Sequence, residues 1–174
     1  MARTADRPRT LAGRSAGELE GLFARGRVPE PPPAGRLRGS LLHLTLGPAG
    51  PLLAPAAAIW LGKRFDTERG CGENVFDRRV FRVGRLLTPA PYQASWPEDA
   101  RSYRALAFST SVGPGALDPG VEVFRIDYDL PGNASPFRRV LDELVEVEPG
   151  VHLGQALLRR RGGHRRLAWF TLES

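Results

Sequence analysis

Proline and glycine divide this chain into short segments, and that punctuation limits what it can fold into. The chain contains 16 prolines and 20 glycines, which interrupt nearly every apolar run. Apolar runs of this length, with aromatic residues inside them, are typical of β-strands rather than of long helices. The sequence therefore predicts a mainly β protein and disfavours a helical bundle.

The length and composition are those of one globular domain. The chain has 174 residues, of which 41% are hydrophobic and 25% are charged, and such a chain can bury a core of ordinary size. The longest apolar stretch, residues 52–61, contains a proline and is shorter than the roughly 18 residues that a membrane-spanning helix needs. We therefore expect a soluble protein without a membrane span.

The N-terminal region contains a predicted helix. Residues 1–14 are polar and arginine-rich without periodicity, and we expect a mobile basic tail that is dispensable for stability. Ser15 and Glu18 have the spacing of a capping box, and apolar residues follow at helical spacing until Gly26. The prolines within residues 29–33 prevent the helix from continuing and predict an extended linker.

After the linker, eight short segments have the composition of strands and are bounded by glycine, proline or polar residues. They are residues 37–46, 56–65, 75–87, 103–111, 121–128, 140–147, 151–159 and 165–172. Eight antiparallel strands are enough for a sheet to close into a barrel. We predict that residues 15–174 form one lipocalin-like antiparallel β-barrel of about eight strands, with the short N-terminal helix packed across one open end. Residues 137–147 also fit a helical period, so strand and helix both stay open there.

Cysteine usage and charge bear on the compartment and the partners. Cys71 is the only cysteine and the N-terminus has no apolar segment of a secretory signal, so we expect a cytoplasmic protein. The net charge is +6, but all except one of the 25 Lys+Arg residues are arginines, which indicates high-GC codon usage rather than selected phosphate contacts. The densest basic run, residues 159–166, has the pattern of two strand ends around a Gly-Gly turn. We therefore disfavour a nucleic-acid partner, and the sequence is compatible with a homodimer.

The segment from Trp60 to Phe65 contains the only lysine of the chain, Lys63. Strand alternation places Lys63 on the same face as Leu61 and Phe65, and it places Trp60 on the opposite face. If the apolar face points inward, Lys63 is buried and could anchor an anion, act as an acid or base, or form an imine. Replacing a buried Lys63 with methionine should then preserve or raise stability. The alternative, which we favour, places Lys63 near the strand end with its ammonium group in water.

Short motifs around this segment resemble a known group of proteins. They are Gly35-Arg36-Leu37-Arg38-Gly39, Trp60-Leu61-Gly62-Lys63-Arg64-Phe65, Tyr128-Asp129-Leu130-Pro131 and Leu153-Gly154. This pattern is similar to that of uncharacterised bacterial GXWXG-type barrel proteins, although the first pair of glycines encloses Arg-Leu-Arg and lacks the tryptophan. The resemblance implies a small lipocalin-like barrel and transfers no catalytic residue. Some small barrels of related shape act as cofactor-free cyclases, which is an analogy of fold alone.

The segment 121–128 carries a second group of candidates. Glu122 and Tyr128 share one face with alternating apolar residues, so we expect Tyr128 to point inward. Glu122 is then either an interior carboxylate with a raised pKa or a charge at the rim. Asp127 and Asp129 lie with Arg125 on the opposite face, where we expect an exterior charge ladder.

Other polar residues give weaker signals. Asp142 and Glu143 begin the most acidic stretch of the chain, and we expect them to pair with arginines on adjoining segments. His43, His152 and His164 are far apart in sequence and predict no metal site. We expect His43 and His152 to be surface or rim residues. Nucleotide-loop and hydrolase motifs are missing, so we expect no cofactor.

Together these patterns predict a barrel whose interior binds one predominantly apolar small molecule, in bacterial lipid or secondary metabolism. The expected ligand contacts are Trp60, Phe65, Tyr128 and Trp169. Lys63 offers a charge for a carboxylate, enolate or phenolate. The competing hypothesis is a cofactor-independent cyclase, isomerase or lyase in the same pocket, with catalytic Lys63, Glu122 and Tyr128. A third hypothesis, a basic RNA-binding or scaffold protein, requires the arginines to cluster on one face.

Overall fold

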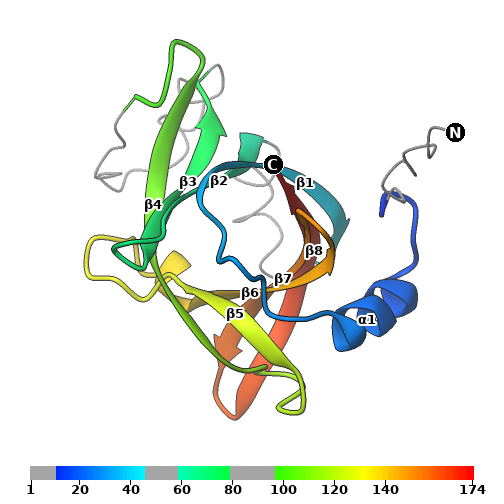
Figure 1. Ribbon diagram of the computed structural model, residues 1–174. Helices are drawn as coiled ribbons and strands as arrows, with labels where there is room; N and C mark the ends of the chain where they lie inside the picture. Colours follow the sequence, from blue (N-terminus) through cyan, green and yellow to red (C-terminus); the bar gives the residue numbers. More distant parts are fainter. Residues whose placement is uncertain (1–10, 46–58, 79–96) are drawn as a thin grey trace, which may run out of the picture.

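The computed structural model describes residues 11–45, 59–78 and 97–174, which form a closed antiparallel barrel of eight strands in sequential order (Figure 1). The elements are α1 Ala16–Arg25, β1 Gly35–Leu44, β2 Trp60–Asp66, β3 Cys71–Asp77, β4 Ser102–Pro114, β5 Glu122–Asp127, η2 Phe137–Arg139, β6 Val140–Glu148, β7 Val151–Arg160 and β8 Gly163–Glu173. Antiparallel pairing of β1 with β8 closes the sheet. The predicted mainly β barrel with one short N-terminal helix is confirmed.

Strands β3 and β6 bear on two of the predictions. The third strand was expected at residues 75–87, whereas β3 spans Cys71–Asp77. It starts earlier because β2 and β3 form a hairpin in which Asp66 pairs with Cys71, so the polar residues between them make a tight turn. The alternation at positions 80–83 lies outside the described residues. Residues 140–148 form strand β6, which pairs with β5 and β7. Of the helix considered for residues 137–147, only the single 3₁₀ turn η2 is present.

Inward-facing side chains fill one half of the barrel. They come from every strand except β3 and β7, and from Tyr128 just after β5, and they make one cluster: Leu37, Phe65, Phe108, Phe124, Ile126, Tyr128, Leu144, Phe170 and Leu172. The linker between α1 and β1 crosses this end of the barrel (Figure 1). It is held at β6 by paired backbone hydrogen bonds between Arg27 and Glu146, and beyond β2 by a 2.8 Å hydrogen bond from Thr67 Oγ1 to the carbonyl of Pro33. This end is therefore closed by the linker, with Val28 packed on the core.

The helix lies against the outside of the barrel wall, so its expected place across an open end was wrong (Figure 1). Its buried face packs on outward-pointing apolar residues of β5 to β8, in a second cluster: Leu11, Leu19, Phe23, Val121, Val123, Val145, Leu153 and Trp169. The rings of Phe23 and Trp169 meet edge to face, with centroids 5.5 Å apart. The outer wall carries an apolar patch here, and the helix removes that patch from water.

The same cluster includes Leu11, which is only 7% exposed. Ordered packing therefore begins within the segment that we expected to be a mobile tail at residues 1–14. Residues 1–10 lie outside the described residues. Because Leu11 contributes to the core beneath α1, we no longer expect residues 11–14 to be dispensable.

The capping box predicted for Ser15 is present. Ser15 Oγ accepts a hydrogen bond from the Glu18 backbone at 3.4 Å, and Glu18 Oε2 accepts one from the Ser15 backbone at 2.9 Å. We expect Ser15→Ala to lower the free energy of unfolding by about 1 kcal/mol, because one orphan amide of the helix loses its acceptor. Urea denaturation would measure this change, with the exposed Ser111→Ala on β4 as a control. Equal stability of the two variants would contradict a capping role.

Candidate pocket inside the barrel

A cavity of about 140 Å³ occupies the half of the barrel opposite the linker. Its lining is mainly apolar and comes from all strands except β5: Leu41, Leu44, Trp60, Lys63, Asn74, Phe76, Leu106, Tyr128, Phe137, Val140, Asp142, Ala156, Leu167, Ala168 and Phe170. Leu41 and Leu44 are 40% and 41% exposed and belong to its outer part. The polar side chains lie deeper, near the middle of the barrel. The cavity thus has mainly apolar walls and a few polar side chains at its inner end.

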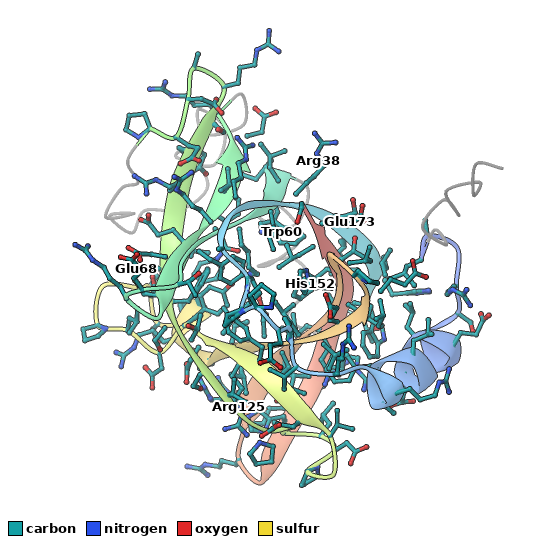
Figure 2. The ribbon with its side chains drawn as sticks, viewed as in Figure 1. Arg38, Trp60, Glu68, Arg125, His152 and Glu173 are labelled. Atoms are coloured by element: carbon teal, nitrogen blue, oxygen red, sulfur yellow. The ribbon has the colours of Figure 1, made fainter. Side chains whose placement is uncertain are left out.

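A β-bulge in β2 brings both Trp60 and Lys63 into this cavity. Strict alternation would put these two residues on opposite faces, as the sequence predicted. In the structure the register with β3 shifts between Trp60 and Gly62, so Leu61 is an extra residue. Gly62 has φ +130, a conformation that L side chains rarely adopt. Figure 2 shows Trp60 inside the ring of strands.

Lys63 is buried, with only 2% of its surface exposed, so the favoured rim position was wrong. Its ammonium group donates hydrogen bonds to Asn74 Oδ1 at 2.9 Å, to Asp142 Oδ2 at 2.8 Å and to the hydroxyl of Tyr128. The three acceptors account for all three N–H groups of the ammonium. Lys63 is therefore held as one side of a buried ion pair, with Asp142 only 4% exposed.

The neighbouring groups complete a closed hydrogen-bond network. Tyr128 donates to Asp142 Oδ2 at 3.0 Å, and Asn74 Nδ2 donates to the Tyr128 hydroxyl at 2.9 Å and to the Leu106 carbonyl at 3.2 Å. The indole of Trp60 donates to Asn74 Oδ1 at 2.9 Å. Lys63, Asn74, Tyr128 and Asp142 form one unit, which we call the polar floor. Each member fixes the orientation of another.

Burial governs the electrostatics of this unit. It lowers the pKa of Lys63, although the carboxylate of Asp142 opposes the shift. Burial and the same carboxylate raise the pKa of Tyr128 well above its usual value, so the phenol stays protonated at neutral pH. Four aromatic rings surround the ammonium at 5.1 to 5.5 Å from their centroids: Trp60, Phe108, Tyr128 and Phe170. Their faces and the carboxylate together replace the water that Lys63 gives up.

The structure brings three of the predicted site residues together and separates three others. Trp60, Lys63 and Tyr128 line the cavity. Phe65 is buried deeper in the core, against Phe108 and Phe124. Trp169 points out of the barrel onto α1, because its neighbour Phe170 takes the inward position on β8. Glu122 is exposed at the start of β5, about 20 Å along the strand from Tyr128.

Two members of the polar floor were missed from the sequence. Asp142 was expected to pair with an arginine, but it alternates with Val140 and Leu144 on the inward face of β6 and meets Lys63. The alternation of Asp142 with these apolar residues can be read from the sequence. The neighbouring acidic residues favour a surface interpretation of the whole stretch. Asn74 was not singled out because nothing in its local sequence distinguishes it from a strand-end polar residue.

The remaining charged candidates lie outside the cavity. Glu143 faces outward beneath the loop after β4 and accepts hydrogen bonds from Gln155 at 2.8 Å and from the backbone of Ala116 at 2.7 Å, not from arginines. Asp127 and Asp129 lie outside the cavity as expected, but Arg125 is not their partner: Asp127 pairs with Arg159 at 2.6 Å and Asp129 with Arg138 at 2.7 Å. The Arg125 guanidinium donates instead to the carbonyl of Pro114. His43 is exposed, as expected, 2.8 Å from the carbonyl of Arg14.

His152 differs from expectation, because it is buried at 6% exposure and pairs across the sheet with Glu146, the residue to which the linker is hydrogen-bonded. Burial lowers its pKa below 6.5, against the opposing effects of a hydrogen bond to the Leu172 carbonyl and of the Glu146 carboxylate. The unfolded chain then binds a proton at a pH where the folded chain does not, so stability falls as the pH drops below about 6.5. We expect His152→Gln to flatten this part of the profile, measured by urea denaturation between about pH 7.5 and pH 5. Parallel profiles for the two proteins would contradict it.

Within the described ranges, no three His, Cys, Asp or Glu side chains are grouped so that they could hold a metal ion. Among the same residues, no helix is long and apolar enough to cross a membrane.

Comparisons with known proteins support the fold alone. No protein-family model matches the chain, and none of the curated proteins matches it. Among solved structures, the chain is similar to one described as the crystal structure of a protein from Thermomonospora curvata. The two share 18% sequence identity with a TM-score of 0.50, over 92% of this chain and 87% of that chain. The similarity to GXWXG-type proteins therefore gains no family assignment and extends no further than a small eight-stranded barrel.

Proposed function

We propose that this protein binds one predominantly apolar small molecule in the barrel, with the molecule's polar end against the floor. The observation that carries the proposal is the cavity itself, which has mainly apolar walls and four hydrogen-bonded polar side chains in its lining. Binding sites for small molecules have this character, with apolar walls and a few placed polar groups. A purely structural core of this size would fill the space with side chains.

The cavity volume limits the ligand. About 140 Å³ is close to the roughly 150 Å³ of an engineered apolar cavity that accommodates benzene. The part of the ligand held in the barrel is thus one six-membered ring or an aliphatic group of similar size. Trp60, Phe76 and Phe170 offer ring surfaces for such a group.

Filling the cavity tests this proposal. Ala156 lines it and pairs with Asp142 across β6 and β7, so Ala156→Leu should place extra carbon atoms in the ligand's space. We expect one-ring probes such as toluene to raise the melting temperature of the wild type, and to raise that of Ala156→Leu much less. Ala100→Leu, at an exposed position, is the matched control and should respond like the wild type. Equal shifts in all three proteins would place the binding elsewhere.

A second candidate function is acid-base catalysis without a cofactor, as in an isomerase, cyclase or lyase. It is favoured by the direct contacts among Lys63, Tyr128 and Asp142, three titratable groups with access to one cavity. Asp142 replaces Glu122 in this set, since Glu122 lies at the other end of the barrel. Tyr128→Phe separates the two functions: it should slow turnover of a substrate with little effect on its binding, whereas a binding protein would show no turnover to lose.

A further inference from the structure

Resting on the proposed function, we propose that the ligand is a neutral molecule whose ring carries a hydroxyl group, and that this hydroxyl donates a hydrogen bond to Asp142 Oδ1. The ligand class is therefore a one-ring phenol or cyclic alcohol rather than a carboxylate. The inference follows from a count of the donors and acceptors that the cavity lining presents.

The donors are all used within the protein. The three N–H groups of Lys63 go to Asn74, Tyr128 and Asp142. Both N–H groups of Asn74 and the indole N–H of Trp60 also have acceptors, and the Tyr128 hydroxyl donates to Asp142. No side-chain donor among the described lining residues is left for a ligand.

One strong acceptor is left. Both hydrogen bonds to Asp142 go to Oδ2, and no described residue donates to Oδ1. Asp142 lines the cavity, yet its side chain is only 6% exposed. A carboxylate oxygen to which no described residue donates is a strong acceptor for a group that enters the cavity. A hydroxyl group of a ligand in the cavity that Asp142 lines would supply such a donor.

The charge balance favours a neutral ligand. Lys63 and Asp142 form a 2.8 Å ion pair, so the polar floor carries no net charge. An anionic ligand would meet the free oxygen of Asp142 and would find no N–H of Lys63 to receive it. The expected role of Lys63 as an anchor for a carboxylate, enolate or phenolate is replaced by a role in orienting Asp142.

Three one-ring probes test the inference: phenol and toluene, which have the same size, and the anion benzoate, each titrated into the wild type at neutral pH and followed by NMR. Phenol and toluene should both bind, and benzoate should bind more weakly than either. The comparison uses only the folded wild-type protein. Tighter binding of benzoate than of phenol would overturn the inference, because it would make Lys63 the anchor.

Asp142→Asn tests the named atom. The variant's amide oxygen should turn toward Lys63 and its amide nitrogen toward the cavity, which converts the free acceptor into a donor. We expect the ratio of phenol to toluene affinity to fall severalfold, because the phenol hydroxyl exchanges a charge-assisted hydrogen bond with a carboxylate for a weaker one with a neutral amide. Benzoate should gain affinity, since the ammonium of Lys63 is then uncompensated. An unchanged phenol-to-toluene ratio in a folded variant would overturn the inference.

Failure of the inference and failure of the proposed function give different results. If toluene binds the wild type but not Ala156→Leu, the barrel cavity binds apolar molecules whatever the phenol result is. If none of the three probes binds the wild type, the proposed function fails together with the inference. If the Asn variant does not fold, the wild-type order of phenol and benzoate still decides between Asp142 and Lys63.

Discussion

Asp142→Ala should destabilise the barrel by about 3–5 kcal/mol, the usual cost of removing one partner from a buried ion pair. The ammonium of Lys63 stays behind at 2% exposure, with Asn74 and Tyr128 as its remaining acceptors. Neither of these groups carries a negative charge at neutral pH, so the burial of the ammonium is no longer compensated. Urea denaturation with circular dichroism would measure the loss.

The double variant Lys63→Met with Asp142→Leu is the control for this prediction. It removes both charges and fills their space with apolar atoms, and such replacements are often neutral or stabilising. We expect the double variant to be more stable than either single variant. The sequence predicts that Lys63→Met alone is neutral or stabilising. With the ion pair in place, we expect this variant to destabilise the protein, because the carboxylate of Asp142 stays buried without its partner. A double variant as unstable as Asp142→Ala would contradict the ion-pair explanation.

Gly62→Ala should lower the free energy of unfolding by about as much as Asp142→Ala, and it should also distort the pocket. A Cβ at this position would lie 2.1 Å from the carbonyl oxygen of Leu37 and 2.6 Å from the amide nitrogen of Gly39, both backbone atoms of the paired strand β1. Its φ of +130 adds backbone strain for any L side chain. We expect a loss of more than about 3 kcal/mol, or failure to fold, because two strands must separate.

Gly162→Ala is the matched control for this effect. Gly162 also has a positive φ, +84, in the turn between β7 and β8, but a Cβ there would meet nothing within 4 Å. Gly162→Ala should lower the free energy of unfolding only by the backbone strain, on the order of 1–2 kcal/mol. Similar losses in the two variants would mean that conformation alone, rather than close strand contact at the bulge, explains the requirement for glycine at position 62.

Much of the fold could be predicted because it depends on local signals. Proline and glycine positions separate the strands, the spacing of Ser15 and Glu18 marks the helix start, and alternation places Tyr128 inside. The position of α1 could not be predicted in this way. It depends on an apolar patch on the outer wall, which residues from four strands assemble only after the barrel has closed.

The polar floor depends on two features that strand alternation does not describe. A single extra residue, Leu61, turns both Trp60 and Lys63 inward, and a period of two cannot represent that insertion. The partner of Lys63 is 79 residues away in sequence, and only the barrel register brings Asp142 to it. Aromatic character alone also does not decide which face a residue takes: the sequence predicts Trp169 as a pocket contact, but Phe170 holds the inward position on β8.

The most direct test of the barrel pocket uses two indole groups as reporters. Trp60 lines the cavity, whereas Trp169 lies outside the wall beneath α1. In ¹H–¹⁵N spectra of the wild-type protein titrated with toluene, the indole resonance of Trp60 should shift with saturation while that of Trp169 stays in place. A shift of Trp169 without one of Trp60, or no saturable shift of either, would contradict a ligand site inside the barrel.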